Sequence, residues 1–569
     1  MTSAAPQTYS LETLLAGRDD APAFVDQGNT VSRGQLRAAS AAAAHGLRAL
    51  GFKRGDVLAL WLPNGLAWLQ LLFAAARLGV LIVPVSTRYK APEVKYLLEV
   101  SRARGIVAAT RFLDTDYVAV AHGLQAEVAT LEQVLALENV TGFMPFAAGT
   151  HGADSATLDQ AGGDGAALLC CFSTSGTTGP PKLAAHRHDS IARHAYYVAR
   201  ALDIRPGDAM LCVLPFFGVF GFMAALGALA RGAACVSMPV YDAEAAAHAI
   251  ARHRISHVIG ADTMFDAMMR VEGADFSTWR RAVQADFAGL AIAVTQRGSD
   301  LGIAFTGTYG SSECYSLMSF QNFDAGVEQR ARAGGVPVDP EIAVRIADPE
   351  TGRVLGAGAV DNSGNPGNPS NPSQPGEPGE PGEIQIQGPN LLACYLNNPE
   401  ATAKAITADG WFRSGDLGYH DGAGFVYLAR MGDSLRLRGY LVSPAEIEHC
   451  LMQHPSVGGA QVVGVKRPGQ GDVAVAYVIA ASGDAAPDSL STPGTPGTPG
   501  TPSEPVLHAH CRASMAAYKV PVRIVLIDQF PAINGPNGNK IQKRVLREWA
   551  QRDFGDTSNA PSTQPERTA

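Results

Sequence analysis

Short apolar runs recur along the first part of the chain, and stretches with helical periodicity separate them. Residues 57–61 and 80–85 are such runs, whereas residues 33–50 and 66–78 have the spacing of helices. Strands without polar alternation are buried on both faces of their sheet, and helices that cross over between them make those strands parallel. The pattern therefore predicts an α/β fold built on parallel strands.

The chain is too long for a single hydrophobic core. Its 569 residues exceed several-fold the roughly 100–200 residues of an ordinary domain. We expect a large N-terminal domain at residues 1–430, with mixed and parallel sheets and helices. A hinge at residues 431–434 should lead into a small, mobile α+β domain at residues 435–554.

Two segments within these domains are rich in Pro and Gly. Residues 362–382 repeat Asn-Pro and Gly-Glu-Pro units, and residues 483–505 contain Thr-Pro-Gly repeats. Segments of this composition bury too little apolar surface to pack. We expect both to be loop expansions, and we expect the tail at residues 555–569 to be disordered.

The composition favours small-molecule chemistry. The chain has 46% hydrophobic residues, a net charge of −8 and no basic cluster, which argues against nucleic acid as a partner. Its eight cysteines form no CxxC pair and no cluster at zinc spacing, so we expect buried free thiols in a reducing, cytoplasmic setting.

The N-terminus lacks the features of a signal peptide. Polar residues interrupt the long apolar stretches at 66–85 and 219–238, so each is expected to be a buried helix and strand rather than a membrane span.

A loop rich in hydroxyl groups and glycine follows the apolar run at residues 166–172. Residues 173–182 read STSGTTGPPK, so the loop offers main-chain N–H groups, hydroxyls and Lys182 to an anion, and a polyphosphate suits this set. It is not a Walker A loop, because prolines precede the lysine and Leu183 follows where that motif has Ser or Thr. A flexible surface turn is the alternative.

This loop resembles the signature loop of the adenylate-forming superfamily, which comprises acyl- and aryl-CoA synthetases, adenylation domains of peptide synthetases, and luciferases. Further motifs follow in the order of that family and extend the resemblance over roughly residues 30–549. The resemblance implies that the loop binds the phosphates of ATP and that Thr178 takes part in catalysis. The nucleotide-binding residues implied in the loop are Thr174, Ser175, Gly176, Thr177, Thr178, Gly179 and Lys182.

A strand at residues 209–214 leads into an aromatic turn and then an apolar helix. Aromatic residues beside a phosphate site can wall an acyl or aryl pocket, although at a strand end they are more often ordinary core. The resemblance favours a pocket, because the family has a Leu-Pro-x-Phe-His type motif here. Gly218 stands where many members carry His. The acyl-pocket residues implied by the resemblance are Phe216, Phe217, Gly218, Thr306 and Gly307.

Residues 304–313 end a strand with an aromatic residue, a glycine and a carboxylate. A tyrosine ring can stack on adenine, and a glutamate near a triphosphate can hold Mg²⁺, although a lone Glu at a strand end is usually a solvated loop residue. The stretch resembles the family's Tyr-Gly-x-Thr-Glu motif, which implies that Glu313 binds the metal and contributes to catalysis. The nucleotide-binding residues implied in this region are Gly289, Tyr309, Gly310 and Ser312.

Residues 411–418 closely match the family's Gly-Trp-Phe-x-Thr-Gly-Asp motif. A carboxylate on a tight glycine turn, here Asp416, can accept both ribose hydroxyls, although a bare Ser-Gly-Asp is only a turn signal. Arg430 opens a stretch that resembles the family's linker motif, and it is implied to contact the ribose and phosphate. By the same resemblance Asp433 is the hinge residue.

The small domain carries the last motifs. Arg438, Gly439 and Tyr440 are implied to contact CoA, because they resemble the linker of the CoA ligases. Near the C-terminus the family has a Gly-Lys-Ile motif whose lysine reaches the carboxylate and the α-phosphate. Here Asn539 replaces that glycine, and Lys540 matches the catalytic lysine by register. A lysine near a C-terminus is otherwise a solvated charge.

The motifs together indicate an ATP-dependent acyl- or aryl-CoA synthetase. The implied reaction converts a carboxylic acid and ATP into acyl-AMP and pyrophosphate, after which a thiol displaces AMP. ATP, Mg²⁺ and CoA are the expected cofactor and co-substrates, with no integral membrane association, and a homodimer is left open. A stand-alone adenylation enzyme that loads a carrier protein, a luciferase-like oxidase and a non-catalytic binding module remain as alternatives. The sequence does not name the acid, but its N-terminal half resembles synthetases for medium-chain, alicyclic or aryl acids.

Overall fold

The structure is a computed structural model of the whole chain. It describes residues 8–26, 28–137, 165–174, 181–287, 289–355, 379–433, 435–437, 440–442, 444–467, 471–481, 502–515, 517, 519–535 and 538–555. The two expected loop expansions lie largely outside these ranges. Gly382 already belongs to a strand and Glu504 to a helix, so regular structure resumes before each expected loop ends.

The first sheet of the large domain is mostly parallel. Strands β4, β3, β5 and β6 run parallel, β7 joins β4 in the same direction, and β8 and β19 complete the edge antiparallel. The parallel part is the α/β sheet that the apolar runs predict. In order across the sheet the strands are β19 (Cys394–Tyr395), β8 (Leu183–Arg187), β7 (Leu168–Ser173), β4 (Leu81–Pro84), β3 (Val57–Trp61), β5 (Gly105–Ala108) and β6 (Gln133–Ala136).

The second sheet changes character half-way. Its strands from β1 to β13 run parallel to their neighbours, with β2 antiparallel at the edge, whereas from β13 to β17 every pairing is antiparallel. In order across the sheet the strands are β17 (Val354–Leu355), β16 (Ala343–Ala347), β18 (Gly382–Gln387), β20 (Phe412–His420), β21 (Phe425–Arg430), β15 (Gly334–Pro337), β14 (Tyr315–Phe320), β13 (Ala304–Ser311), β12 (Arg281–Ala285), β11 (His257–Ala261), β9 (Ala209–Cys212), β10 (Ala234–Ser237), β1 (Pro22–Asp26) and β2 (Asn29–Ser32).

Helices connect the strands and join the two sheets into one core. Both α3 and α9 are largely apolar and buried along nearly their whole length, as expected for helices enclosed by other elements. A continuous hydrophobic cluster runs from the first sheet through these helices to the second sheet. The helices of the large domain are α1 (Leu11–Leu14), α2 (Arg33–Ala49), α3 (Leu66–Leu78), α4 (Ala91–Ser101), α5 (Tyr117–Gln125), α8 (His188–Ala201), α9 (Val219–Ala230), α10 (Ala243–Arg252), α11 (Asp262–Met268), α12 (Ala291–Asp300), α13 (Val327–Ala331) and α14 (Pro399–Ala405).

The small domain has its own hydrophobic cores, one on each face of a mixed sheet. It follows strand β21 through a short 3-10 helix at Met431–Asp433, so the chain passes from one domain to the other where the hinge is expected. Its elements are β22 (Leu435–Leu437), β23 (Tyr440–Val442), α15 (Pro444–Met452), β24 (Val457–Arg467), β25 (Gly471–Ala480), α16 (Glu504–Ser514), β26 (Arg523–Leu526), β27 (Ala532–Gly535), β28 (Gly538–Ile541) and α17 (Lys543–Phe554).

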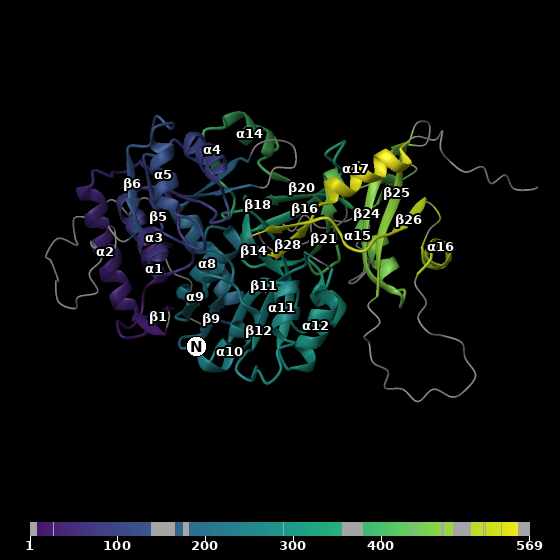
Figure 1. Cartoon of the computed structure of the whole chain (residues 1–569), viewed down its shortest axis with the longest axis horizontal. Coiled ribbons are helices and arrows are strands. Elements are labelled where there is room, and N and C mark those ends of the chain that lie inside the picture. Colours follow the sequence, from purple (N-terminus) through teal and green to yellow (C-terminus); the bar gives the residue numbers. More distant parts are fainter. Residues whose placement is uncertain are drawn as a thin grey trace, which may run out of the picture.

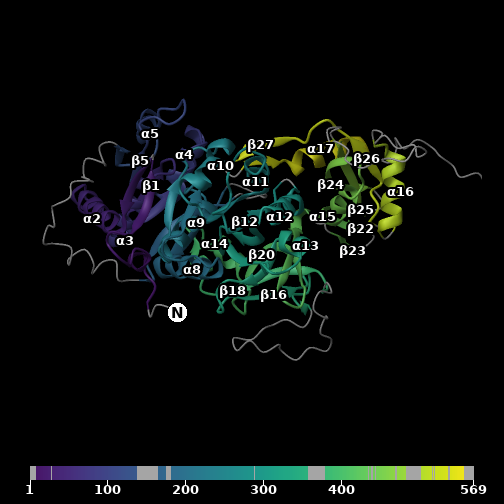
Figure 2. The same ribbon diagram turned by 90° about the horizontal axis from the view of Figure 1, so that it is seen from below.

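The small domain lies at one end of the long axis of the molecule, beyond the second sheet (Figures 1 and 2). The hairpin of β27 and β28 does not join its main sheet. In both views this hairpin extends away from that sheet and lies on the side of the large domain where α11 is found. The expected α/β fold with a small C-terminal domain is therefore confirmed.

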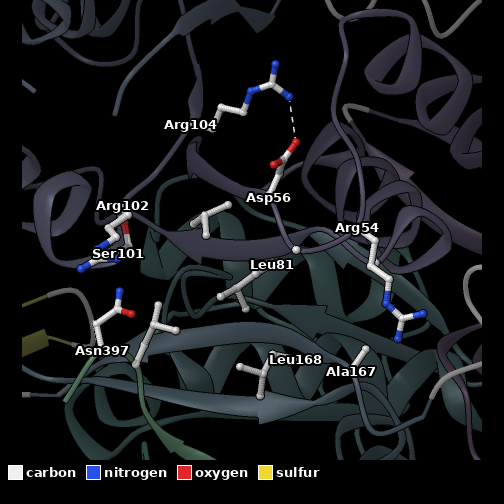
Figure 3. A pocket seen from close by; sticks show the side chains of 13 residues that line it. Arg54, Asp56, Leu81, Ser101, Arg102, Arg104, Ala167, Leu168 and Asn397 are labelled. Carbon is white, nitrogen blue, oxygen red and sulfur yellow. Dashed lines mark hydrogen bonds and ion pairs between the residues drawn. The ribbon is translucent and has the colours of Figure 1, made fainter. Parts of the chain in front are cut away.

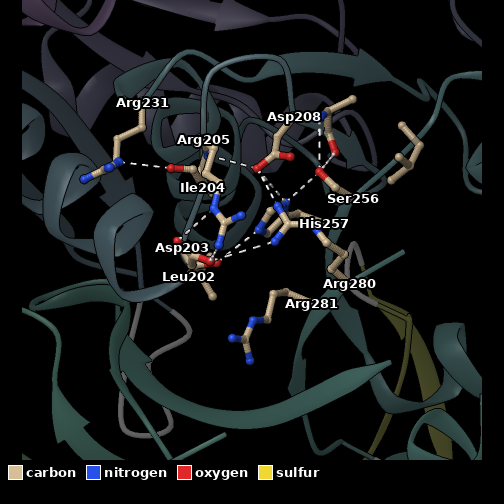
Figure 4. Close-up of polar contacts among 12 residues, drawn as sticks. Leu202, Asp203, Ile204, Arg205, Asp208, Arg231, Ser256, His257, Arg280 and Arg281 are labelled. Atoms are coloured by element: carbon tan, nitrogen blue, oxygen red, sulfur yellow. Dashed lines mark hydrogen bonds and ion pairs between the residues drawn. The ribbon is translucent and has the colours of Figure 1, made fainter. Parts of the chain in front are cut away.

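A polar cluster lies at the amino-terminal ends of the parallel strands β9, β11 and β12 (Figure 4). His257 donates from Nε2 to the Leu202 carbonyl at 3.0 Å, and its Nδ1 lies 2.8 Å from the Ser256 hydroxyl. Asp208 accepts from Arg280 at 2.7 Å. Burial lowers the pKa of His257 to about 4, so this histidine is neutral in the folded protein.

Candidate active site

The phosphate loop predicted from the sequence joins β7 to β8, and its two ends are hydrogen-bonded to each other. The Thr174 N–H donates to the Lys182 carbonyl at 2.8 Å, and the Lys182 N–H donates to the Thr174 hydroxyl at 3.2 Å. The Tyr96 hydroxyl donates to the Pro181 carbonyl at 2.8 Å. The loop therefore emerges from a fixed base at the carboxyl end of β7. Its tip lies outside the described residues and carries the predicted Ser175, Gly176, Thr177, Thr178 and Gly179.

Lys182 and Glu313 both contact one tyrosine, Tyr395. The Lys182 Nζ lies 4.3 Å from the centre of the Tyr395 ring, which is the geometry of a cation–π contact. The Tyr395 hydroxyl donates to Glu313 Oε1 at 2.9 Å. The structure thus brings together the predicted phosphate-binding lysine and the predicted metal-binding carboxylate, which are far apart in the sequence.

The turn that carries Glu313 is held by three hydrogen bonds to consecutive carbonyls. His186 donates to the Ser312 carbonyl at 2.7 Å, the Leu392 N–H to the Glu313 carbonyl at 2.7 Å, and the Asn390 side chain to the Cys314 carbonyl at 2.8 Å. Gly310 is required in the strand before the turn, because a Cβ there would lie 2.4 Å from the Tyr315 carbonyl oxygen. The main chain around Glu313 is therefore fixed independently of its side chain.

Two ring-stacking contacts of Tyr315 support this turn. The Tyr315 ring stacks between His186 and His194, with ring centres 4.1 and 4.9 Å away. His194 also donates to the Ser316 carbonyl at 3.0 Å. Burial lowers the pKa of both histidines to about 4, so the stack is uncharged.

Tyr309, Asp416 and Arg430 form a second cluster beside Glu313. The Tyr309 hydroxyl donates to Asp416 Oδ2 at 2.6 Å, and Arg430 Nε lies 3.0 Å from Asp416 Oδ1. Asp416 and Arg430 face each other across the β20–β21 hairpin, which explains why they are fourteen positions apart in the sequence. Gly415 adopts a φ of 68°, a conformation that favours glycine and turns the strand just before the carboxylate.

Both burial and neighbouring charges shift the pKa values of Asp416 and Arg430. Burial raises the pKa of Asp416 to about 6, while Arg430 and the Tyr309 hydroxyl act in the opposite direction. The Glu313 carboxylate is close enough to raise the pKa of Asp416 further and to favour the charged form of Arg430. A carboxylate with an adjacent guanidinium can accept hydroxyl groups and bind a phosphate.

The residues present fit a magnesium–nucleotide complex. Tyr395 occupies one oxygen of Glu313, and a carboxylate has a second oxygen that can ligate Mg²⁺. Among the residues that the structure describes, no group of three or more His, Cys, Asp or Glu side chains could hold a metal ion. Mg²⁺ characteristically takes one or two protein carboxylates and completes its shell with phosphates and water, so a single glutamate suffices.

The loop that carries Gly289 is held by two carboxylates. The Gly289 N–H donates to Asp286 at 2.8 Å, and buried Asp262 accepts from the N–H groups of Phe287 and Leu290 at 3.3 and 3.1 Å. Gly289 has a φ of 82°. The loop is thus anchored to the start of α11, and Ala288 lies outside the described residues.

The predicted acyl-pocket residues have two different environments. Phe216 is buried and packs edge-on against Trp68, whereas Phe217 and Gly218 are partly exposed at the start of α9. Thr306 is fully buried and donates to the Gln321 carbonyl at 2.9 Å. Gly307 is packed against main chain, since a Cβ there would lie 2.2 Å from the Arg332 carbonyl oxygen. The aromatic turn is therefore the part of this set that reaches the surface.

Asn64 holds the aromatic turn in place. Its amide donates to the Leu214 carbonyl at 2.8 Å, and its Oδ1 accepts from the Phe216 N–H at 2.7 Å. The residue is buried in the loop between β3 and α3. It therefore ties the first sheet to the predicted acyl-binding turn of the second.

The motifs of the small domain are only partly described. Lys540 lies in β28 opposite Ile533 of β27, in the hairpin that extends toward the large domain. Asp433 ends the 3-10 helix, and Tyr440 begins β23. Arg438 and Gly439 lie outside the described residues.

A cavity of about 470 Å³ opens at the opposite end of the first sheet (Figure 3). Leu168 lines it at the start of β7, whereas the phosphate loop follows the end of that strand. Arg54, Arg102 and Arg104 also line it, but Arg104 is paired with Asp56 at 2.8 Å. None of the residues that converge around Glu313 lines this cavity, so it is not the candidate active site.

Sequence reasoning missed four residues of the site: Asn64, His186, Asn390 and Tyr395. Each reaches its partner across a long stretch of sequence, such as the 82 positions between Glu313 and Tyr395. Apart from His186, no regular spacing in the sequence relates these residues to the motifs. The position of His186 four residues after Lys182 is the one local signal.

Comparison with known proteins finds matches along nearly the whole chain. Residues 11–396 match the AMP-binding enzyme family, and residues 446–534 match the AMP-binding enzyme C-terminal domain. A methyl-dioxo-octahydro-indenyl-propanoyl:CoA ligase of Mycobacterium tuberculosis is 30% identical over 95% of this chain and 98% of its own length. Feruloyl-CoA synthase of Amycolatopsis is 28% identical over 93% of this chain and 95% of its own.

Solved structures show the same fold. ATP-bound MatB from Rhodopseudomonas palustris superposes with a TM-score of 0.78 at 22% identity, over 96% of this chain and 99% of that one. The anthranilate CoA ligase AuaEII, in complex with anthranoyl-AMP, has a TM-score of 0.76 at 21% identity, over 96% and 98% of the two chains. With its two family matches and its full-length relatives, the chain belongs to the AMP-binding enzymes, the adenylate-forming superfamily that includes the acyl- and aryl-CoA synthetases.

Proposed function

We propose that this chain activates a carboxylic acid with ATP and transfers the acyl group to CoA at the site around Glu313. The protein is an acid–thiol ligase that forms an acyl-CoA, AMP and pyrophosphate, in keeping with relatives named CoA ligases along nearly their whole length. The observation that carries the residue assignment is the convergence of Tyr309, Glu313, Asp416 and Arg430, with Lys182 at the base of the phosphate loop. These residues come from four separate motifs.

In the first half-reaction an oxygen of the acid attacks the α-phosphorus of ATP. The bond from that phosphorus to the oxygen of the β-phosphate breaks, and pyrophosphate leaves. Asp416 and Arg430 hold the ribose, the Tyr309 ring lies against the adenine, and Lys182 with the loop hydroxyls of Thr177 and Thr178 binds the phosphates. Glu313 would hold Mg²⁺, which would neutralise phosphate charge when bound.

Lys540 supplies the remaining positive charge. The attacking and leaving oxygens share negative charge in the transition state, and a cation placed there stabilises that state more than the bound substrates. The hairpin that contains Lys540 extends toward the large domain (Figures 1 and 2), which supports this role in the first half-reaction.

In the second half-reaction the thiol sulfur of CoA attacks the acyl carbonyl. The bond to the phosphate oxygen breaks, AMP leaves, and the thiol proton passes to solvent. We assign a rotation about Asp433 to the interval between the steps, so that Lys540 leaves and Arg438, Gly439 and Tyr440 reach CoA. The short linker between the domains supports this assignment.

The acid class we propose is alicyclic, aryl or medium-chain. The relatives named above act on a fused-ring propanoic acid and on an aryl acid. A Cβ at Gly218 would meet nothing closer than the Pro215 carbonyl oxygen at 3.6 Å, so packing does not require a glycine there. The absence of a side chain at this position supports a wide entrance to the acyl pocket. The aromatic turn therefore has room beside Phe217.

The test is pyrophosphate release across a panel of carboxylic acids, followed by identification of the thioester by mass. We expect release with bulky cyclic or medium-chain acids, and an acyl-CoA in each such reaction. Release that never yields acyl-CoA, but acylates the phosphopantetheine of an added carrier protein, would assign the enzyme to carrier loading instead. No release with any acid would overturn the proposal.

The cellular setting is also part of this proposal. No helix in the described part of the chain is long and apolar enough to cross a membrane. All eight cysteines are unpaired, which supports a reducing, cytoplasmic location. A homodimer remains a prediction, and light scattering of the purified protein would test it.

A further inference from the structure

Tyr395 reaches the active site from an element that no motif identified. It lies in the short strand β19, opposite Ala184 of β8. Because β8 begins directly after Lys182, this register brings the ring to the base of the phosphate loop. The ring is buried, and the lysine Nζ lies over it at 4.3 Å from the ring centre. One face of the tyrosine ring therefore contacts the Lys182 ammonium group.

The hydroxyl of the same tyrosine forms a hydrogen bond with Glu313. It donates to Oε1 at 2.9 Å. A hydrogen bond to a carboxylate is shorter and stronger than one between neutral groups. One oxygen of Glu313 is thus oriented, and the other is left for a cation.

The main chain of Glu313 does not depend on Tyr395. His186, Leu392 and Asn390 hold the three carbonyls of residues 312–314, as described above. The role of Tyr395 is therefore limited to the side-chain carboxylate, which would otherwise be free to change rotamer. This separation makes its contribution measurable.

We propose that Tyr395 is a positioning residue that orients the Glu313 carboxylate for the metal and holds Lys182 at the phosphates. The inference rests on the proposed function of this site. A partner that orients a metal-ligating side chain is typically worth about 10- to 100-fold in metal affinity or activity. The phenol has two separable contacts, so two substitutions distinguish them.

The experiment measures Mn²⁺ binding to the enzyme–ATP complex by electron paramagnetic resonance, without acid or CoA. Tyr395→Phe keeps the ring and removes the hydroxyl, and we expect it to weaken Mn²⁺ binding about 10-fold while metal-free ATP binding is unchanged. Tyr395→Leu removes both contacts and should also weaken ATP binding. The matched control is Tyr117→Phe, which removes a hydroxyl of α5 that donates to the Thr87 carbonyl at 2.7 Å and not to Glu313. This control should leave Mn²⁺ binding unchanged.

A double-mutant cycle tests whether the effect passes through Glu313. In a Glu313→Gln background, Tyr395→Phe should have no further effect on Mn²⁺ binding. An equal loss in both backgrounds, or wild-type Mn²⁺ affinity in Tyr395→Phe, would overturn the proposal. Failure of the wild type to activate any acid, with the Tyr395 effect on Mn²⁺ intact, would instead refute the proposed function and leave the role of Tyr395 standing.

Discussion

At the scale of single residues, Asp416 links nucleotide binding to pH. Its carboxylate accepts hydrogen bonds from hydroxyl groups more strongly when it is deprotonated, and burial raises its pKa to about 6. As the pH falls through 6 the carboxylate takes up a proton, so the enzyme should lose affinity for ATP, by up to tenfold per pH unit below that value. ATP titrations followed by calorimetry between pH 5 and 8 measure this. Asp416→Asn should bind ATP more weakly at pH 8 and lose the pH dependence, whereas an unchanged profile would remove Asp416 from the ribose site.

His257 makes folding stability depend on pH in a predictable direction. Burial lowers its pKa in the folded protein to about 4, below the ordinary value near 6.5. Between these values the unfolded chain binds a proton that the folded chain does not, so stability falls as the pH decreases from about 6.5 to 4, by at most about 1.4 kcal/mol per pH unit. His257→Gln should unfold at a lower temperature at pH 7, and its melting temperature should fall less between pH 7 and pH 5 than that of the wild type. Parallel curves for the two proteins would contradict the assignment.

At the scale of elements, one buried side chain aligns the acyl-binding turn. Asn64 makes hydrogen bonds to both the Leu214 carbonyl and the Phe216 N–H, and loss of each leaves a buried main-chain group without its partner. Asn64→Ala should raise the KM for the acid several-fold while the KM for ATP changes little, because we propose that the turn contacts the acid and not the nucleotide. Steady-state kinetics with each substrate varied in turn would show this. A larger effect on ATP than on the acid would place the turn elsewhere.

The elements themselves could be predicted from the sequence, and their contacts could not. Apolar runs and helical spacing predict β3, α3 and β4 within a residue or so, because burial on both faces leaves a local signature. The order of motifs likewise indicates Tyr309, Asp416 and Arg430, which the structure brings together. Tyr395 escaped prediction, because its place beside Glu313 depends on the pairing of β19 with β8, a long-range register that no local pattern encodes.

At the scale of the whole molecule, the two domains divide the chemistry. The proposed nucleotide-binding cluster belongs to the large domain, whereas Lys540 belongs to a hairpin of the small one, and the two domains are joined through Met431–Asp433. The hairpin extends toward the large domain, so this arrangement suits the adenylation step (Figures 1 and 2). Asp433→Pro removes a main-chain donor and fixes φ at the hinge. We expect the substitution to preserve acyl-AMP formation and to slow thioester formation, which single-turnover assays of each step would separate.

The central claim is that one site performs two half-reactions and that Lys540 serves only the first. By analogy with a single oxyanion-hole donor, a cation aimed at the transition state is worth roughly 10²–10³ in rate. The direct measurement compares wild type and Lys540→Ala in acid-dependent pyrophosphate release and in conversion of supplied acyl-AMP and CoA to thioester. The account predicts a loss of at least that order in the first assay and near-normal rates in the second. Equal losses in both assays, in a variant that remains folded, would contradict it.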